Sequence, residues 1–234
     1  MSADNPRELV LQACRGLAAY GLGPGIGGHV SVRVPGEDRY WTNALDRSFE
    51  EMQLEDILLL SFDGELLDGD RIISPGIGFH PGIYQLREDV GAIVHTHGYW
   101  ITAQSAFGRE PRALHNLCTY FTNRTAVAPD DEIESIAPAL RADDCAIVIP
   151  WHGAITIGPD IAAAAALHVT FDYACRLDVT LAGAQGIAEM PPDHARSMQQ
   201  LLGRANYLNL TWDLMQRKAA RSYNGEVVVP SLVP

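Results

Sequence analysis

The amino-acid sequence predicts a single α/β domain over residues 1–234, in which helices flank a central β-sheet that is mixed or largely antiparallel. Segments with helical periodicity alternate with short apolar segments that are typical of buried strands. Several of the expected strands follow one another closely enough to form hairpins, which favours antiparallel pairing. The chain has no internal repeat, low-complexity tract or linker, so one domain is the simplest division.

The first expected element is an amphipathic helix. Its apolar residues recur at helical spacing from Leu9 to Tyr20, after an asparagine–proline pair that suits a helix start. The glycine-rich segment GLGPGIGGH follows and ends this helix. Beyond it the apolar pattern is typical of strands, and a turn at Asp63-Gly64 joins two of them. We expect strands at 29–34, 40–43, 57–62 and 65–69.

The second half of the chain also alternates between helices and strands. The long last segment has apolar residues at helical spacing and an aspartate near its start, which predicts a single helix. The expected strands are 91–95, 145–150 and 154–158, and the expected helices are 81–88, 99–107, 131–141, 160–178 and 192–219.

The composition is that of an ordinary globular protein, with 47% apolar and 20% charged residues. Seventeen Lys and Arg residues against 29 Asp and Glu residues give a formal charge of -12. This charge repels phosphate backbones and anionic lipids, so we expect a small-molecule partner and neither nucleic acid nor membrane. No apolar segment approaches the roughly 20 residues that span a bilayer, and the N-terminus lacks the features of a signal peptide. We therefore expect a cytoplasmic protein.

The cysteines are scattered along the chain and form no CxxC pair. Such a pattern favours neither a disulfide framework nor a zinc site. We expect four buried thiols in a reducing compartment, at Cys14, Cys118, Cys145 and Cys175.

The sharpest local signal is AIVHTHG at residues 92–98, which places two histidines at the end of an expected strand. Successive strand residues point to opposite faces, so His95 and His97 project from the same face. The pair alone also suits two solvent-facing histidines, but His152 lies at the end of another apolar strand, before a glycine. Three imidazoles can hold one divalent ion per subunit, Zn, Mn, Fe or Co, and leave positions open for water or substrate.

Five motifs occur in a defined order: GGHVSVR at 27–33, FDGELLDG at 62–69, FHPGIYQLREDVGAIV at 79–94, HTHG at 95–98 and WHGAITIG at 151–158. Together they resemble the class II aldolase/adducin family, over roughly residues 7–215. The resemblance implies the family's α/β fold and a metal ion held by His95, His97 and His152. It also implies a homotetramer of four-fold symmetry with sites at the subunit boundaries.

The sequence departs from the family pattern at one position in particular. Family aldolases and epimerases carry an acidic residue four positions before the histidine that matches His80, where this chain has Gly76. A glycine cannot take a proton, so the family's usual base or fourth metal ligand is missing. Ser74-Pro75 and His29 also replace the family's phosphate-binding hydroxyl pair and loop asparagine. The substrate we expect is a short oxo- or hydroxy-acid, or an aromatic analogue, instead of a sugar phosphate.

Three residues are candidates for catalytic groups: His29, His115 and Tyr120. His29 lies in the loop that matches the family's substrate-binding turn, where it either contacts substrate or makes a structural hydrogen bond to the backbone. His115 and Tyr120 lie in HNLCTYF, a segment that reaches the active site in family members, in some from the neighbouring subunit. A phenol can protonate a substrate oxygen, and packing in an aromatic core is the alternative for Tyr120.

Four residues are candidates for substrate binding: Gly28, Ser74, Asp46 and Arg47. The resemblance places Gly28 and Ser74 in the two loops that hold substrate in the family. Asp46 and Arg47 follow the expected strand at 40–43. Arg47 can clamp a carboxylate with two N–H groups, and a surface ion pair is the alternative.

The remaining conspicuous side chains have structural roles in our interpretation. Asp172 matches a family carboxylate, and it either orients a metal-binding histidine or is a structural acid. We expect His80 to cap or pack a short helix, and His168 and His194 to lie on helix surfaces or at interfaces. A stripe at helical spacing fits core or subunit contact, with Tyr207, Leu208, Trp212 and Met215 as its members.

Three functional classes are compatible with these residues. The first, and the one we expect, is a metal-dependent lyase of aldolase or decarboxylase type, with His29 or a hydroxide on the metal as its base. The second is a non-haem Fe(II) oxygenase acting on an aromatic oxo-acid, as reported for aminocoumarin-pathway members of this superfamily that lack the acid. The third is a non-enzymatic, adducin-like interaction module, although adducin-type domains lose the metal histidines that this chain retains.

Overall fold

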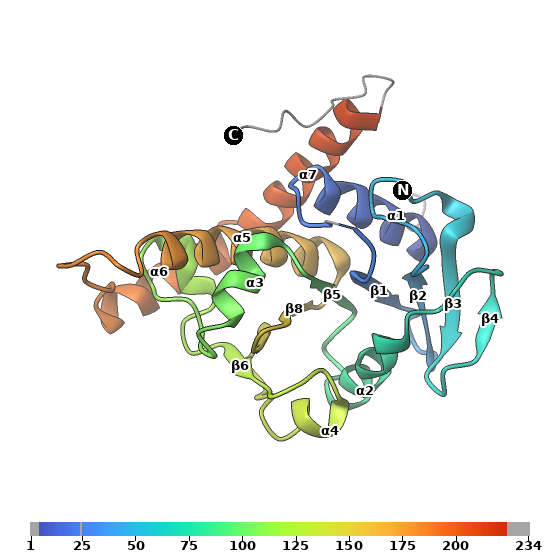
Figure 1. Cartoon of the computed structure of the whole chain (residues 1–234), viewed down its shortest axis with the longest axis horizontal. Helices are drawn as coiled ribbons and strands as arrows, with labels where there is room; N and C mark the ends of the chain where they lie inside the picture. The colour runs from blue at the N-terminus through green and yellow to red at the C-terminus, as the bar shows by residue number, and fades with distance from the viewer. Residues whose placement is uncertain (1–4, 24, 224–234) are drawn as a thin grey trace.

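The computed structural model in Figure 1 describes residues 5–23 and 25–223, which include one eight-stranded sheet. The strand order across the sheet is β4-β3-β2-β1-β5-β8-β7-β6. Neighbouring strands are antiparallel except for the parallel pair β6 and β7, which confirms the predicted fold class. The strands are β1 (His29–Arg33), β2 (Arg39–Asn43), β3 (Ile57–Ser61), β4 (Leu66–Asp68), β5 (Ala92–Thr96), β6 (Thr125–Val127), β7 (Ala146–Ile149) and β8 (Gly153–Gly158).

Helices cover both faces of the sheet, so the molecule has three layers (Figure 1). One face packs against α1, α3 and α5, on which α7 packs in turn, and the other face packs against α2 and α4. In the described part of the chain, every helix lacks the combination of length and apolar character that a membrane span requires. The helices are α1 (Pro6–Ala18), α2 (Phe79–Leu86), α3 (Tyr99–Ser105), α4 (Ile133–Ile136), α5 (Ile161–Thr180), α6 (Pro192–Arg204) and α7 (Tyr207–Tyr223), with 3-10 turns η1 (Leu54–Asp56), η2 (Pro75–Gly78) and η3 (Asn116–Tyr120).

The side chains of the central strands alternate between two apolar cores. In β5, Ala92 and Val94 enter the core that includes α1 and α5, whereas Ile93 enters the core that includes α2. This period of two continues to the end of the strand. As a result, His95 faces the α2 side of the sheet and Thr96 faces α5.

The strand register brings the histidine-bearing segments together. β5 pairs with β1 so that His95 lies opposite His29, and it pairs with β8 so that Thr96 lies opposite Ala154. A three-residue turn between β7 and β8 carries His152. The turn therefore delivers His152 to the same edge of the sheet at which β5 ends.

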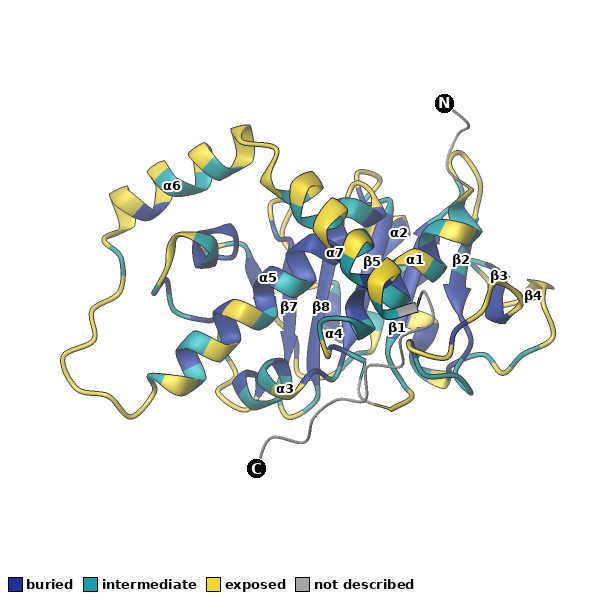
Figure 2. Cartoon of the chain, turned by 90° about the horizontal axis from the view of Figure 1, so that it is seen from above, coloured by how far each residue is buried: buried dark blue, intermediate teal, exposed yellow. Residues whose placement is uncertain are grey.

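The predicted single helix at 192–219 is wrong, because the chain forms the two helices α6 and α7 there. Asn206, between them, has a φ of 51°. A residue in this left-handed conformation cannot continue an α-helix, and asparagine adopts it more readily than most residues. Figure 2 shows that α6 projects from the body with a largely exposed surface.

The predicted helix at 131–141 is also wrong in its length, because only Ile133–Ile136 form a helix. Pro138 lies two residues further on, where its ring and missing N–H prevent the helix from continuing. The short helix packs directly against α2. A Cβ on Gly82 would overlap the side chain of Ile133, so the glycine allows this close packing.

The predicted burial of the cysteines and of most of the stripe on α7 is confirmed. Met215 is fully buried, and Leu208 and Trp212 pack against the same core while partly exposed. Tyr207 has 36% of its surface exposed. All four cysteines are buried and free, namely Cys14, Cys118, Cys145 and Cys175.

The prediction that His168 lies on a helix surface or at an interface is wrong, whereas His194 is exposed on α6 as predicted. His168 is fully buried in α5 and lies between Thr96 and Thr156 of the sheet, with ring-to-hydroxyl distances of 2.8 Å and 2.9 Å. Buried residues three and four positions away share its helix face, and this spacing in the sequence is the signal that indicates its burial. His80 is buried in α2 as predicted, where its Nδ1 lies 2.7 Å from the hydroxyl of Ser31.

Replacing His168 with alanine is expected to lower the free energy of unfolding by about 3 kcal/mol or more, because it opens a cavity and leaves two buried hydroxyl groups without their partner. Urea unfolding followed by circular dichroism measures the change. His194→Ala is the matched control, and at its exposed position we expect a change within about 0.5 kcal/mol. Equal stabilities of the two variants would contradict the role assigned to the buried ring.

Candidate metal centre

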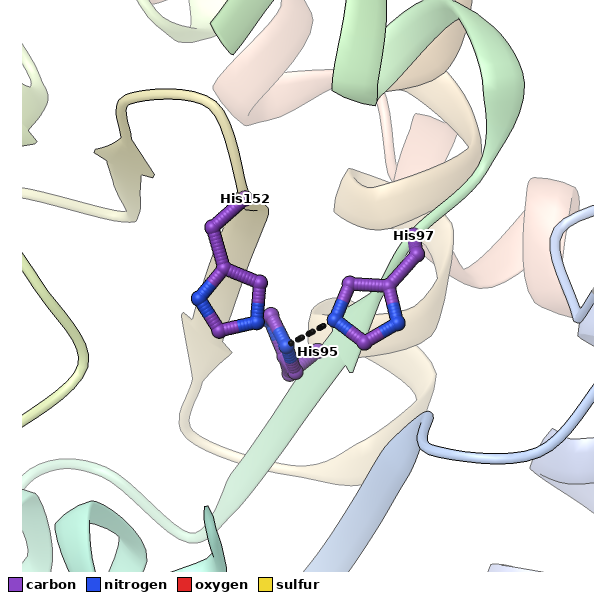
Figure 3. A group of neighbouring side chains, drawn as sticks. All are labelled: His95, His97 and His152. Atoms are coloured by element: carbon purple, nitrogen blue, oxygen red, sulfur yellow. Dashed lines mark hydrogen bonds between the residues drawn. The ribbon is translucent and has the colours of Figure 1, made fainter.

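Three histidines converge at one edge of the sheet (Figure 3). His95 lies near the end of β5, His97 directly follows this strand, and His152 lies in the turn before β8. One ring nitrogen of each lies within 4.8 Å of the corresponding nitrogens of the other two. His95 is buried, while His97 and His152 are partly exposed, so the cluster is open to solvent on one side. It is the only such group of potential metal ligands found among residues 5–23 and 25–223.

The backbone of β8 sets the orientation of His95. Nδ1 of His95 lies 3.0 Å from the carbonyl oxygen of Ala154. A carbonyl oxygen only accepts hydrogen bonds, so Nδ1 carries the ring proton and Nε2 is left as a potential metal ligand. This Nε2 lies 3.0 Å from Nε2 of His97. Two ring nitrogens this close suit a shared cation, which removes the repulsion between their lone pairs.

The glycine after His152 is required by the close approach of two strands. A Cβ on Gly153 would lie 2.7 Å from the carbonyl oxygen of Thr96 and 3.4 Å from Cε1 of His95. A side chain there would separate β8 from β5 or displace the His95 ring. The histidine–glycine pair in the sequence thus has a packing cause.

Burial keeps two of the three imidazoles uncharged. The pKa of His95 lies well below its usual value, mainly because burial penalises the charged ring, and neighbouring histidines lower it further. The pKa of His97 is lowered first by burial and then by His152, while Asp131 raises it. Neutral imidazole is the form that binds a metal ion, so these two rings are ready to bind without first losing a proton.

A chain of hydrogen bonds connects β5, the strand that carries His95, to α5. Oγ1 of Thr156 donates to the carbonyl oxygen of Ala164 at 2.9 Å, so it accepts the proton on Nδ1 of His168. Nε2 of His168 then accepts a hydrogen bond from Oγ1 of Thr96 at 2.8 Å. Burial lowers the pKa of His168 to about 3, so the ring is neutral. Thr96 lies between the two histidines of β5, and this chain therefore holds the strand end from the face opposite His95.

His29 lies next to the three histidines. Its ring centroid is 5.4 Å from that of His95, its partner across the β1–β5 register. Nε2 of His29 lies 2.6 Å from Oγ of Ser74, and its buried Nδ1 has no hydrogen-bond partner among the described residues. Burial, and to a smaller extent His97 and His152, lowers the pKa of His29 to about 3. The structure thus brings two predicted residues together, but the catalytic role of His29 and the substrate contact of Ser74 stay predictions.

A small pocket beside His97 contains two of the predicted substrate-binding residues, Gly28 and Arg47. The glycine-rich loop forms one wall and packs on Phe49. A Cβ on Gly28 would lie 2.8 Å from Cζ of that ring, so the loop approaches it closely. Arg47 and His97 line the same pocket, whose volume of about 10 Å³ holds about one water molecule.

Arg47 and its neighbour Asp46 also form ion pairs, which is the alternative to substrate binding by Arg47. Nε of Arg47 lies 3.7 Å from Oδ1 of Asp56, a buried carboxylate that Arg71 approaches more closely, at 2.9 Å. Asp46 lies 3.9 Å from Arg71. These distances describe weak pairs for Arg47 and Asp46, and substrate binding by either stays a prediction.

His115 and Tyr120 make their contacts elsewhere in the chain. His115 accepts a hydrogen bond from the N–H of Leu117 at 3.2 Å, and its ring contacts Tyr173 of α5. Tyr120 is buried, and its hydroxyl donates to the carbonyl oxygen of Leu202 in α6 at 3.3 Å. Within the described part of one chain, neither residue is recorded in contact with the three histidines. Their catalytic roles therefore stay predictions.

The segment that carries the candidate metal centre matches a known protein family. The family described as class II aldolase and adducin N-terminal domain matches residues 8–179, a range that includes all three histidines. The chain belongs to this family. The resemblance inferred from the motifs is thereby confirmed.

Relatives in the class II aldolase family have names from different reactions. The 4-hydroxy-3-prenylphenylpyruvate oxygenase/4-hydroxy-3-prenylbenzoate synthase of Streptomyces roseochromogenus subsp. oscitans is 29% identical over 225 residues, covering 90% of this chain and 80% of the relative. Decarboxylase NovR of Streptomyces niveus is 29% identical over 190 residues, covering 76% and 70%. The solved structure of L-fuculose 1-phosphate aldolase from Glaciozyma antarctica PI12 has a TM-score of 0.85 at 24% identity, covering 92% and 88%, which shows that the fold is shared.

Two residues beside the candidate metal centre, Asp131 and Trp151, were not predicted from the sequence. Oδ1 of Asp131 lies 3.9 Å from Nδ1 of His152, although the two are distant in sequence and no local pattern connects them. Trp151 directly precedes His152, has a φ of 59° and is 81% exposed. A left-handed backbone is unusual for such a bulky residue. An apolar aromatic side chain next to a metal ligand was the available signal.

Asp172 lies on α5 near the segment that follows His97. Its Oδ1 is buried and has no hydrogen-bond partner among the described residues, and it would lie 3.6 Å from a Cβ on Gly98. Burial raises the pKa of Asp172 to about 6, against a smaller opposite effect of Arg176. Orientation of a metal-binding histidine by this carboxylate stays a prediction.

Replacing any one of the three histidines His95, His97 and His152 with alanine is expected to remove the bound divalent ion and leave the protein folded, because two imidazoles compete poorly with hydration. Elemental analysis after reconstitution with Zn(II) and desalting measures the metal content, and circular dichroism reports the fold. His115→Ala is the matched control and is expected to keep stoichiometric metal. A variant that still carries one ion per chain would exclude the replaced residue as a ligand.

Asp172→Asn is expected to stabilise the metal-free protein at pH 7.5 and to have little effect at pH 4. The pKa is about 6 in the folded protein against 3.8 ordinarily, so between these values only the folded state keeps the proton. Stability is therefore lost as the pH rises through this window and stays reduced above it. Asparagine cannot ionise and should recover up to about 3 kcal/mol at pH 7.5. Urea unfolding at both pH values tests this, and an equal gain at both would disprove the assignment.

Proposed function

We propose that this protein is a divalent-metal-dependent lyase that cleaves a carbon–carbon bond of a small oxo- or hydroxy-acid. The observation that carries the proposal is the convergence of three imidazoles from two strand ends, on a cluster that is partly open to solvent. Membership of the class II aldolase family supports an enzyme of this kind, and its relatives are named aldolase, decarboxylase and oxygenase.

His95, His97 and His152 would hold one divalent ion per subunit. The proton on Nδ1 of His95 leaves the opposite nitrogen available, and the short distance between His95 and His97 fits a shared cation. When bound, the ion supplies Lewis-acid polarisation of a substrate carbonyl group. Three protein ligands are typical of catalytic sites, and imidazole suits Zn, Mn, Fe or Co.

The pocket beside His97 supports a substrate that carries a carboxylate. Arg47 lines this pocket and offers a planar guanidinium group, which binds a carboxylate through two N–H groups. The pair between Arg47 and Asp56 is long, so it does not occupy the guanidinium group fully. Because the chain has a formal charge of -12, an anionic substrate needs such a local cation.

An aromatic oxo-acid is the substrate that we favour. The relative that covers 90% of this chain is named for a prenylated phenylpyruvate. Trp151 precedes the ligand His152, Tyr99 follows the ligand His97 by two positions, and their side chains are 81% and 73% exposed. Exposed rings next to both ligand segments offer apolar contacts to an aryl group.

A non-haem Fe(II) oxygenase is the second candidate function. The same relative is named an oxygenase, and it is similar over more of this chain than the decarboxylase is. Three histidines can hold Fe(II) and leave positions open. The convergence of these histidines gives no support to an interaction module without chemistry.

We also propose that the protein is a cytoplasmic homotetramer. Four free, buried thiols fit a reducing compartment. Exposed apolar side chains on α6 and α7 fit subunit contacts, among them Leu201, Leu210 and Leu214. A neighbouring subunit would then have to bring His115 and Tyr120 to the site, because their contacts within one chain lie elsewhere.

An anaerobic assay tests the proposed lyase function. We expect the protein to turn over oxo-acids in the absence of oxygen. Protein reconstituted anaerobically with Zn(II), Mn(II), Co(II) or Fe(II) is incubated with 4-hydroxy-2-oxo acids and with phenylpyruvates, and the products are followed by NMR. We expect a 2-oxo acid and an aldehyde in equal amounts, or carbon dioxide from a decarboxylation. Turnover that requires both Fe(II) and oxygen would establish the oxygenase instead, and turnover under neither atmosphere would contradict both.

In the same assay Arg47→Gln is expected to raise KM about 10- to 100-fold with a smaller change in kcat, since it removes a charged hydrogen-bond donor to the carboxylate. Arg39→Gln is the matched control. Arg39 pairs with Glu37 at the surface, so its loss should leave KM unchanged. Equal KM values for the two variants would exclude Arg47 as the carboxylate-binding residue.

A further inference from the structure

We infer that Asp131 is the residue that takes the proton from the substrate and returns it, an inference that rests on the proposed lyase function. Asp131 lies in the loop between β6 and α4, and its Oδ1 is 3.9 Å from Nδ1 of His152. Among residues 5–23 and 25–223, no other carboxylate lies within 4.0 Å of a ring nitrogen of the three histidines. With 28% of its side chain exposed, Asp131 is accessible to a molecule bound there.

The second carboxylate oxygen of Asp131 lies beside Gly76. A Cβ on Gly76 would lie 3.5 Å from Oδ2 of Asp131 and 3.3 Å from Cε1 of His29, the ring next to His95. The space beside this glycine is therefore bordered by the Asp131 carboxylate and by the ring of His29. A longer side chain at position 76 would fill the space in front of Oδ2. Glycine keeps it open, so a substrate at the metal centre can reach the carboxylate.

The segment that carries Asp131 is held at both ends. On one side, the N–H of the buried Ala128 donates to the carbonyl oxygen of Val148 at 3.0 Å. On the other side, Ile133 packs so closely on α2 that only a glycine fits at position 82. Asp131 therefore extends from a short, anchored loop, as a proton-transfer group requires.

The other nearby acid–base groups are engaged or face elsewhere. Nε2 of His29 lies 2.6 Å from the hydroxyl of Ser74, and its ring is buried. Asp172 belongs to α5, which packs on the Thr96 face of β5, opposite the face of His95. Of these three groups, Asp131 is the one that combines contact with His152 and a partly exposed side chain.

Cleavage of a 4-hydroxy-2-oxo acid can be written with every proton and electron pair accounted for. Asp131 accepts the proton of the 4-hydroxyl group while the C3–C4 bond breaks, and the O–H electron pair becomes the second bond of the new aldehyde. The electron pair of the C3–C4 bond stays on C3 as the enolate of the 2-oxo acid. Asp131 then gives its proton to C3, which completes the 2-oxo acid and restores the carboxylate. The reverse of this last step, removal of a C3 proton, can be measured without bond cleavage.

Exchange of the C3 protons of pyruvate and phenylpyruvate with deuterated water isolates this step, and proton NMR follows it in the Zn(II)-loaded protein. Asp131→Asn is expected to lower the exchange rate by about 100-fold or more. Its Zn(II) affinity, measured by calorimetry, should change by less than about threefold, because the three imidazoles remain. Asp130→Asn is the matched control. Asp130 is exposed and accepts only the N–H of Glu132, which asparagine can also accept, so wild-type exchange is expected.

A double variant tests whether positions 76 and 131 share one space. Asp131→Asn combined with Gly76→Asp is expected to regain at least about tenfold of the lost exchange, since the new carboxylate would lie beside the old one. A double variant no faster than the single one would contradict this shared space. Wild-type exchange in Asp131→Asn would overturn the inference. So would a tenfold or larger loss of Zn(II) affinity, because Asp131 would then act by orienting His152. No exchange by the wild-type protein would contradict the proposed lyase function itself, and with it the inference.

Discussion

The close pairing of β5 with β8 is the contact on which the metal centre depends. The two strand ends approach so closely that only a glycine fits at position 153. The same approach places the carbonyl oxygen of Ala154 where it orients the His95 ring, and it delivers His152 from the preceding turn. One backbone contact therefore sets both the position and the protonated nitrogen of the buried His95. The partly exposed ligands complete a cluster that a substrate can approach.

The two faces of β5 make different contacts at the candidate metal centre. On one face His95 meets its cross-strand neighbour His29, and on the other Thr96 is bonded to His168 of α5. A buried polar ring is stabilising only when its nitrogens are satisfied, and both nitrogens of His168 have partners. The strand end is thus anchored on its α5 face, while the opposite face, which carries His95, remains available for binding.

The fold alone does not decide the reaction. Relatives by sequence are named for a phenylpyruvate oxygenase, a decarboxylase and sugar-phosphate aldolases, and a fuculose phosphate aldolase shares this fold at 24% identity. One scaffold supports different reactions through the side chains around its site. In this chain we propose that Arg47, Asp131 and Trp151 have this role, together with the absence of a side chain at Gly76.

The sequence by itself determined the features that follow from local periodicity and from motifs. The period of two in β5 predicts that His95 and His97 share a face, and the strand ends predict the position of His152. Short apolar runs also predict the central strands, and β5, β7 and β8 are buried on both faces between the helices. Only the tertiary structure decided which distant groups meet. Asp131 approaches His152 because α4 packs on a glycine of α2, and His168 is buried because its helix face packs on two strand threonines. Such contacts depend on how elements pack in space, and sequence periodicity carries no information about distances between them.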